Sequence, residues 1–176
     1  MRLPQVIETE RLRLRPPVAA DAPFVFSYAS DPAVSRYMTW RPHAAIGRTR
    51  AFLGRCRAVW DDGSAAPWLI ERRADGVPVG MIEVRVEGPR AEVGYVVAPP
   101  HWGQGYAPEA VAAVCDLALV LPEVHRFWAV CDVENAASAR VLEKAGLQYE
   151  GVLRRWLVHP NVADEPRDCH CYAAVR

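Results

Sequence analysis

A glycine-containing loop is the segment of this sequence whose residue types and spacing most favour ligand chemistry. Gly103 and Gly105 follow a β-rich segment, and Pro108 and Glu109 stand in the first turn of the helix that comes next. Glycines let a backbone approach a ligand closely, and the free N–H groups of a helix N-terminus attract an anion such as a phosphate. The pattern alone leaves a second interpretation open, in which both glycines only form a tight strand-to-helix turn.

Two known phosphate-binding patterns do not fit this loop. A dinucleotide fingerprint requires a third glycine where this sequence has Pro108, and an acidic residue that closes the next strand of a parallel unit. Glu123 has about the right separation, but it precedes a strand. A nucleotide-triphosphate loop requires Gly-Lys-Ser/Thr, whereas Tyr106 follows Gly105 here.

Three further polar residues are candidates for chemistry. Asn135 and Ser138 lie at the start of a later predicted helix, where the simplest interpretation is an N-cap and a polar first-turn residue, worth about 1 kcal/mol of helix stability. Glu92 begins the strand before the glycine loop. A half-buried carboxylate there is a candidate general base, and the alternative is a solvent-facing residue paired with an arginine.

The elements that must position these residues follow from the periodicity of apolar side chains. Alternation and turn signals predict strands over 11–15, 68–71, 77–86, 91–97, 125–132, 151–158 and 168–175. Helical spacing predicts helices over 21–28, 46–60, 108–122 and 136–145. We therefore expect one α+β (mixed α/β) domain over residues 1–176, with a single central, mostly antiparallel sheet of about seven strands flanked by about four helices.

Composition narrows the class of protein. The 176 residues include 21 basic and 21 acidic side chains, so the net charge is zero and a strongly cationic nucleic-acid-binding protein is not expected. We find neither a signal peptide nor a membrane-spanning stretch and expect a cytosolic protein. Five irregularly spaced cysteines favour reduced thiols. In a strand, Cys169 and Cys171 share one face while His170 takes the other, so no metal site is expected.

Several segments, taken in order along the chain, resemble the GNAT superfamily of N-acetyltransferases, and within it the branch of ribosomal-protein-alanine acetyltransferases (RimJ/RimL-like). They are Thr9-Glu-Arg-Leu-Arg-Leu-Arg-Pro16, Glu92-Val-Gly-Tyr95, Trp102-Gly-Gln-Gly-Tyr-Ala107 with Glu109-Ala110, Asn135-Ala-Ala-Ser138, Val141-Leu-Glu-Lys-Ala-Gly146 and Glu150-Gly-Val-Leu-Arg154. The resemblance covers nearly the whole chain. It implies an acetyl-CoA-dependent enzyme of the GNAT fold.

The resemblance also implies which residues contact acetyl-CoA. The loop residues Trp102, Gly103, Gln104, Gly105, Tyr106 and Ala107 would wrap the pyrophosphate at the start of the helix. The backbone of Tyr95, Val96 and Val97 would bond to the pantetheine arm where two neighbouring strands splay apart. Asn135 and Ser138 would lie along that arm near the thioester. One departure is Trp102, where the general family pattern has Gln or Arg.

For the reaction, the resemblance favours direct attack of a neutral amine on the thioester. Glu92 is the best candidate for the base, with a water chain as the alternative. Ser138 would steady or protonate the departing thiolate, because the tyrosine that many relatives use one helical turn later is Leu142 here. Tyr37 and Trp40 lie in a segment that borders the acceptor pocket in this branch, although packing in the core is the commoner fate of aromatic residues.

The first expectation for the acceptor is a protein or peptide N-terminal α-amine. The alternatives are a small amine, such as a polyamine, an aminoglycoside or an amino-acid analogue, and a catalytically weak module that only binds acetyl-CoA. Relatives often pair as homodimers, so a dimer is conceivable. The zero net charge argues against the most specific of these acceptors, because ribosomal proteins are very basic and an enzyme steered to them would carry an acidic field.

Overall fold

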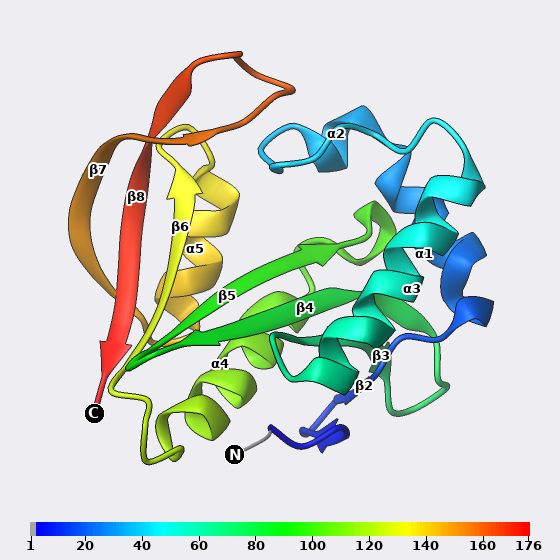
Figure 1. Cartoon of the computed structure of the whole chain (residues 1–176), viewed down its shortest axis with the longest axis horizontal. Coiled ribbons are helices and arrows are strands. Elements are labelled where there is room, and N and C mark those ends of the chain that lie inside the picture. Colours follow the sequence, from blue (N-terminus) through cyan, green and yellow to red (C-terminus); the bar gives the residue numbers. More distant parts are fainter. Residues whose placement is uncertain (1–2) are drawn as a thin grey trace.

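The computed structural model describes residues 3–176, which form one mixed sheet of eight strands, five α-helices and two short 3-10 helices (Figure 1). The strands are β1 Ile7–Glu8, β2 Leu12–Arg15, β3 Ala66–Arg72, β4 Pro78–Glu87, β5 Arg90–Val97, β6 Arg126–Asp132, β7 Gln148–Val158 and β8 Pro166–Val175. The helices are α1 Ala22–Ala29, α2 Pro32–Ser35, α3 Ile46–Asp62, α4 Tyr106–Leu119 and α5 Ala136–Lys144, with 3-10 turns at Ala19–Asp21 and Pro99–His101. The expected fold class is confirmed.

Two elements were not expected from the sequence. β1 has two residues and α2 has four, so neither is long enough to show a hydrophobic period. The remaining strands and α-helices agree with the expected ones to within a few residues, and the two 3-10 turns had no expected counterpart. The largest difference that concerns function is at α4, which begins at Tyr106 rather than at Pro108.

Helices cover both faces of the sheet. On one face, α4 places Ala110, Val111 and Val114 against the sheet at helical spacing, each with no exposed surface. On the other face, α1 and α3 pack against Leu69 of β3 and Met81 of β4. No helix among residues 3–176 is long and apolar enough to cross a membrane.

The sheet opens between β5 and β6. The strand order is β1-β2-β3-β4-β5-β6-β8-β7, and β5 and β6 are its only parallel neighbours within the described residues. They pair only over Arg90–Glu92 and Arg126–Trp128, and Figure 1 shows them starting together and then diverging. β5 stays paired with β4 as far as Val97. The edge of β5 beyond Glu92 therefore presents backbone N–H and C=O groups that have no strand partner.

A β-bulge in β4 lies directly behind that open edge. Glu71 of β3 pairs with Pro78 and Ile70 pairs with Gly80, which leaves Val79 as the extra residue. A Cβ atom at Gly80 would overlap the carbonyl oxygen of Val96 in β5. Glycine at this position therefore lets β4 and β5 approach each other closely.

Candidate active site

The glycine loop lies at the end of β5, where the sheet is open. Gly103 and Gly105 have φ angles of 74° and 80°, in the left-handed region that favours glycine, and Gly105 is the N-cap of α4. The indole Nε1 of Trp102 donates a hydrogen bond of 2.6 Å to the carbonyl oxygen of Val97, which ties the loop to the strand. Tyr106 and Ala107, expected in the loop, instead form the first turn of the helix.

A second group of polar residues lies where α5 begins. Asn135 is the N-cap of α5, and its Oδ1 accepts a hydrogen bond of 3.1 Å from the Ser138 N–H, so the capping interpretation is confirmed. The Tyr95 hydroxyl lies 2.7 Å from the Ser138 hydroxyl and 3.2 Å from the Ser138 carbonyl oxygen. Burial raises the pKa of Tyr95 against the opposing effect of the Ser138 hydrogen bond, so the phenol stays protonated near neutral pH. Tyr95, Asn135 and Ser138 thus form one hydrogen-bonded group.

A buried carboxylate that the sequence reasoning missed supports this turn. Asp132, the last residue of β6, has no exposed surface, and its carboxylate receives hydrogen bonds from the Arg167 guanidinium at 2.6 and 3.1 Å. Its Oδ1 also accepts from the Glu134 N–H, and its carbonyl oxygen accepts from the Asn135 N–H at 2.8 Å. Burial alone would raise the pKa of Asp132, but these hydrogen bonds and the Arg167 charge outweigh it and lower that pKa.

Glu92 lies on the opposite face of β5 from this group. Ala91 and Val93 face the α4 side of the sheet, so strand alternation directs Glu92 toward the α1 and α3 side. Its cross-strand neighbour Arg85 forms its ion pair with Glu83 instead. Glu92 is half-buried, and within residues 3–176 its carboxylate has neither an ion pair nor a hydrogen bond. The structure thus brings together Tyr95, Asn135 and Ser138, and separates Glu92 from them by the plane of the strand.

Tyr37 and Trp40 belong to the segment that links α2 to α3. The Tyr37 ring lies edge-on to His159, with centroids 6.5 Å apart, and Trp40 packs against the buried His43 at 5.5 Å. Asn161, in the β7–β8 connection, donates hydrogen bonds from Nδ2 to the carbonyl oxygens of Ser35 and Trp40 at 2.6 and 2.8 Å. This segment and the β7–β8 connection therefore contact each other.

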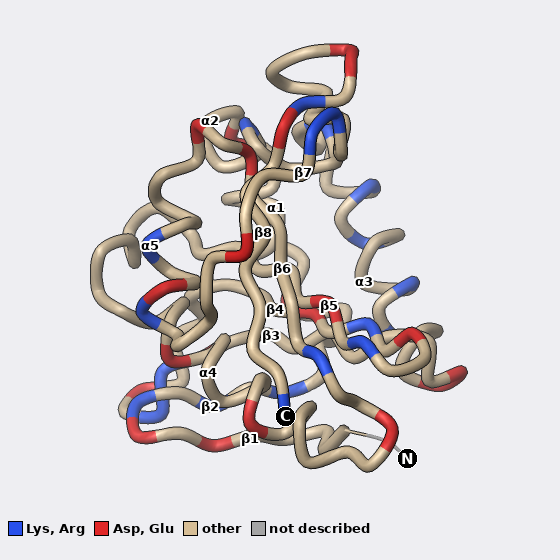
Figure 2. Tube along the Cα trace, turned by 90° about the vertical axis from the view of Figure 1, so that its left-hand side faces the viewer, with Lys and Arg blue, Asp and Glu red and all other residues tan. Residues whose placement is uncertain are grey.

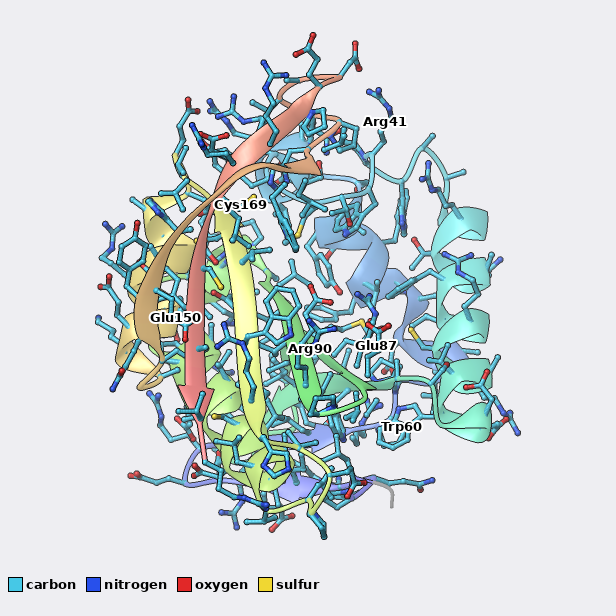
Figure 3. All side chains as sticks on the ribbon, turned by 60° about the vertical axis from the view of Figure 1, so that its left-hand side comes forward. Arg41, Trp60, Glu87, Arg90, Glu150 and Cys169 are labelled. Atoms are coloured by element: carbon cyan, nitrogen blue, oxygen red, sulfur yellow. The ribbon has the colours of Figure 1, made fainter. Side chains whose placement is uncertain are left out.

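A cavity of about 590 Å³ lies between the two segments. Its lining residues are Pro32, Ala33, Ser35, Arg36, Pro42, Asn161 and Val162. In Figure 1, α2 and the β7–β8 connection face each other above the wide end of the gap between β5 and β6. Arg41, labelled in Figure 3, extends the contact through an ion pair of 3.7 Å with Asp164.

The five cysteines are free and buried. Cys131 lies beside Ser138, and burial raises its pKa to about 11 despite the opposing hydrogen bond from that serine. Cys169 and Cys171 are buried in β8, and residues 3–176 hold no group of three potential ligands arranged for a metal ion.

A comparison with known families agrees with this arrangement of open sheet, glycine loop and capped helix. Residues 11–148 match the family model described as the acetyltransferase (GNAT) domain, so the chain belongs to the GNAT acetyltransferases. It is an acetyl-CoA-dependent N-acetyltransferase, as expected from the resemblance.

Three relatives show the range of that family. The chain is 31% identical to the uncharacterised N-acetyltransferase YoaA of Bacillus subtilis over 174 residues, which are 97% of each chain. RimJ of Mycobacterium smegmatis, solved with a CoA disulfide, is 26% identical with a TM-score of 0.81, over 99% of this chain and 84% of that one. A spermidine N-acetyltransferase of Vibrio cholerae, solved with CoA and spermine, shares the fold at 18% identity and a TM-score of 0.78, over 95% and 96% of the two chains.

Proposed function

We propose that this N-acetyltransferase acetylates the N-terminal α-amine of a protein or peptide. The observation that carries the proposal is the wall of the cavity between α2 and the β7–β8 connection. Arg36 is the only ionisable side chain among its lining residues, and none of them is a carboxylate. A polyamine would bring further positive charges next to Arg36. A peptide N-terminus is followed by neutral amides, so it brings no second positive charge close to Arg36.

The chemistry of the attack favours the same acceptor. The amine must be neutral to attack the thioester, and for a lysine-type amine with a pKa near 10.4 this costs about 4.6 kcal/mol at pH 7. For an α-amine with a pKa near 7.9 the cost is only about 1.2 kcal/mol. A single weak base is therefore sufficient for an α-amine. We assign that role to Glu92, whose unpaired carboxylate faces the side of the sheet that carries α1 and α3.

The groups that we assign to the departing thiolate lie on the face of β5 opposite Glu92. The backbone of Tyr95, Val96 and Val97 would hold the pantetheine arm along the open edge, and residues Trp102 to Ala107 would hold the diphosphate. Ser138, whose hydroxyl is bonded to that of Tyr95, would then be the residue that faces the leaving thiol. This pair can donate a hydrogen bond to the thiolate, and Asn135 holds Ser138 in place. In this arrangement, Tyr37 and Trp40 border the acceptor.

The experiment that tests the proposal compares acceptors. The protein is mixed with acetyl-CoA and, separately, with peptides that begin with Ala or Ser, with spermidine, with aminoglycosides and with amino-acid analogues, and free thiol release is followed. We expect the peptides to give the highest kcat/KM. The same peptides carrying an N-terminal acetyl group are the matched control and should give none. A higher kcat/KM with spermidine or an aminoglycoside would refute the proposal.

A variant tests the role of the cavity wall. Arg36→Glu supplies the carboxylate that the wall lacks, and it should raise the kcat/KM for spermidine relative to that for peptides. Arg41→Glu is the matched control, because Arg41 is also exposed and nearby but does not line the cavity. If both substitutions change the ratio of the kcat/KM values for spermidine and peptides equally, the cavity wall does not determine which acceptor is used.

We also propose that the protein works in the cytosol. Its five cysteines are all free and buried, which suits a reducing compartment.

A further inference from the structure

Arg11 connects the first strands to the glycine loop. Its guanidinium donates a hydrogen bond of 3.0 Å from Nη1 to the Gln104 carbonyl oxygen, and its Cζ lies 5.0 Å from the centroid of the Tyr106 ring. A Cβ atom at Gly105 would lie 3.3 Å from its Nη2. One side chain from the segment before β2 thus contacts Gln104 and Tyr106, the residues on either side of Gly105, at the turn from the loop into α4.

Two further residues fix the position of that guanidinium. Glu109, in the first turn of α4, accepts from the Arg11 Nε at 2.7 Å and from the Arg11 N–H at 2.9 Å. The Thr9 hydroxyl donates to the same carboxylate at 2.5 Å. Burial would raise the pKa of Glu109, but these hydrogen bonds and the Arg11 charge lower it, so the carboxylate is ionised at neutral pH. An isolated surface ion pair contributes little, whereas this one is held by several charge-assisted bonds.

The bond to Gln104 has a geometric consequence for the loop. A trans peptide unit is planar, so the N–H of Gly105 points away from the carbonyl group of Gln104. When Arg11 holds that carbonyl on its own side, the Gly105 N–H faces the opposite side. The N–H groups of the α4 N-terminus are the donors that an anion would use there.

We propose that Arg11 is a positioning residue for the diphosphate of acetyl-CoA. Held by Thr9 and Glu109, it fixes the Gln104–Gly105 peptide so that its N–H group faces the diphosphate. The inference rests on the proposed assignment of the glycine loop to diphosphate binding.

The test measures binding of CoA and of dephospho-CoA, which lacks the 3′-phosphate but keeps the diphosphate, by calorimetry. Arg11→Ala should weaken both ligands by about tenfold, the size expected for one charge-assisted hydrogen bond. Arg13→Ala is the matched control, because Arg13 belongs to β2, has the same 46% side-chain exposure and forms an ion pair with Glu71 instead. It should leave both dissociation constants within twofold.

Two further variants keep the proposal falsifiable if Arg11→Ala folds poorly. Arg11→Lys keeps the charge but cannot bond Gln104 and Glu109 in the same planar geometry, so it should restore only part of the affinity. Glu109→Gln keeps the shape of the partner and should weaken both ligands by a smaller factor than Arg11→Ala. Thermal unfolding of each variant separates a loss of fold from a loss of affinity.

Three outcomes would overturn the inference. If Arg11→Ala weakens the binding of CoA but not of dephospho-CoA, Arg11 contacts the 3′-phosphate. If Arg11→Ala and Arg13→Ala weaken binding equally, Arg11 contributes only general surface charge. If Arg11→Lys restores the full affinity, the orientation of the Gln104–Gly105 peptide does not depend on the guanidinium. Because CoA binding requires no acceptor, these results are independent of the peptide assay. A protein that binds CoA through Arg11 and acetylates no peptide would refute the proposed acceptor alone.

Discussion

Replacement of Gly80 by alanine is the sharpest test of how the sheet prepares the cofactor site. The new Cβ would lie 3.0 Å from the Val97 Cα and 3.1 Å from the Val96 carbonyl carbon, and it would overlap the Val96 carbonyl oxygen. Ordinary contacts of a Cβ begin at 3.4 Å. All three atoms belong to the backbone, so no side-chain rotation relieves the clash. β5 must retreat from β4 by about an ångström, or the bulge at Val79 must rearrange.

The cost has two parts. Overpacking in a close-packed interior costs about 1–3 kcal/mol, so the free energy of unfolding should fall by that amount. The displaced residues, Val96 and Val97, are also those whose backbone we expect to bond to the pantetheine arm. CoA affinity should therefore fall by about tenfold, which corresponds to the loss of roughly one hydrogen bond.

Gly94→Ala is the matched control for stability. Gly94 lies on β5, the strand that pairs with Gly80's strand, yet a Cβ there meets no atom within 4 Å. Urea unfolding and CoA calorimetry on both variants give the measurement. If Gly80→Ala unfolds at the same urea concentration as Gly94→Ala and binds CoA as tightly as the unmodified protein, the close approach of β4 to β5 has no role in the site.

Three further changes test the remaining assignments. Ser138→Ala should lower kcat more than it weakens acetyl-CoA binding, because its hydroxyl is expected to act on the departing thiolate, and an unchanged kcat would exclude that role. Glu92→Gln should lower the rate most at low pH, where the amine most needs a base, and a pH profile identical to that of the unmodified protein would remove Glu92 from the mechanism. Asp132→Asn should lower the free energy of unfolding at pH 7 by about 1–3 kcal/mol, because it removes the charge that accepts two hydrogen bonds from Arg167, which keeps only its ion pair with Glu134. The folded-state pKa of Asp132 is lowered, so its stabilising contribution is complete above the unfolded pKa of about 3.9 and is lost as pH falls below it; urea unfolding from pH 7 to pH 3 should show this acid slope weakened in the variant.

The fold could be predicted because long elements carry their own signal. Val111 and Val114 repeat at helical spacing, and the strands from Ala66 to Val97 are short β-rich segments separated by turn signals, so local residue types indicated both. The short β1 and α2 carry no such period. β1 forms by pairing with the adjacent β2, and α2 begins at an Asp31 N-cap followed by Pro32, so both depend on single local contacts that a periodicity does not reveal.

Within the site, the same distinction holds between local and distant contacts. The glycine loop and the Asn135 cap are built from residues close in sequence, and their spacing was sufficient to find them. The contact between Arg11 and Glu109 joins residues 98 positions apart, and that between Asp132 and Arg167 joins residues 35 apart. Arg11 belonged to a recognised segment of the family resemblance, but only the fold shows which carboxylate it meets.

The free-energy cost of deprotonating the amine can discriminate between acceptors without any long-range electrostatic field from the protein. The net charge is zero, and Figure 2 shows basic and acidic residues interspersed along the trace rather than gathered by sign on the face it presents. Making a lysine-type amine neutral costs about 3.4 kcal/mol more than making an α-amine neutral, a factor of roughly 300 in reactive fraction at pH 7. A cavity wall with Arg36 and no carboxylate does nothing to reduce that difference for a polyamine. The proposed α-amine acceptor therefore requires no acidic surface, and the missing acidic field argues against steering to a basic protein, not against an α-amine acceptor.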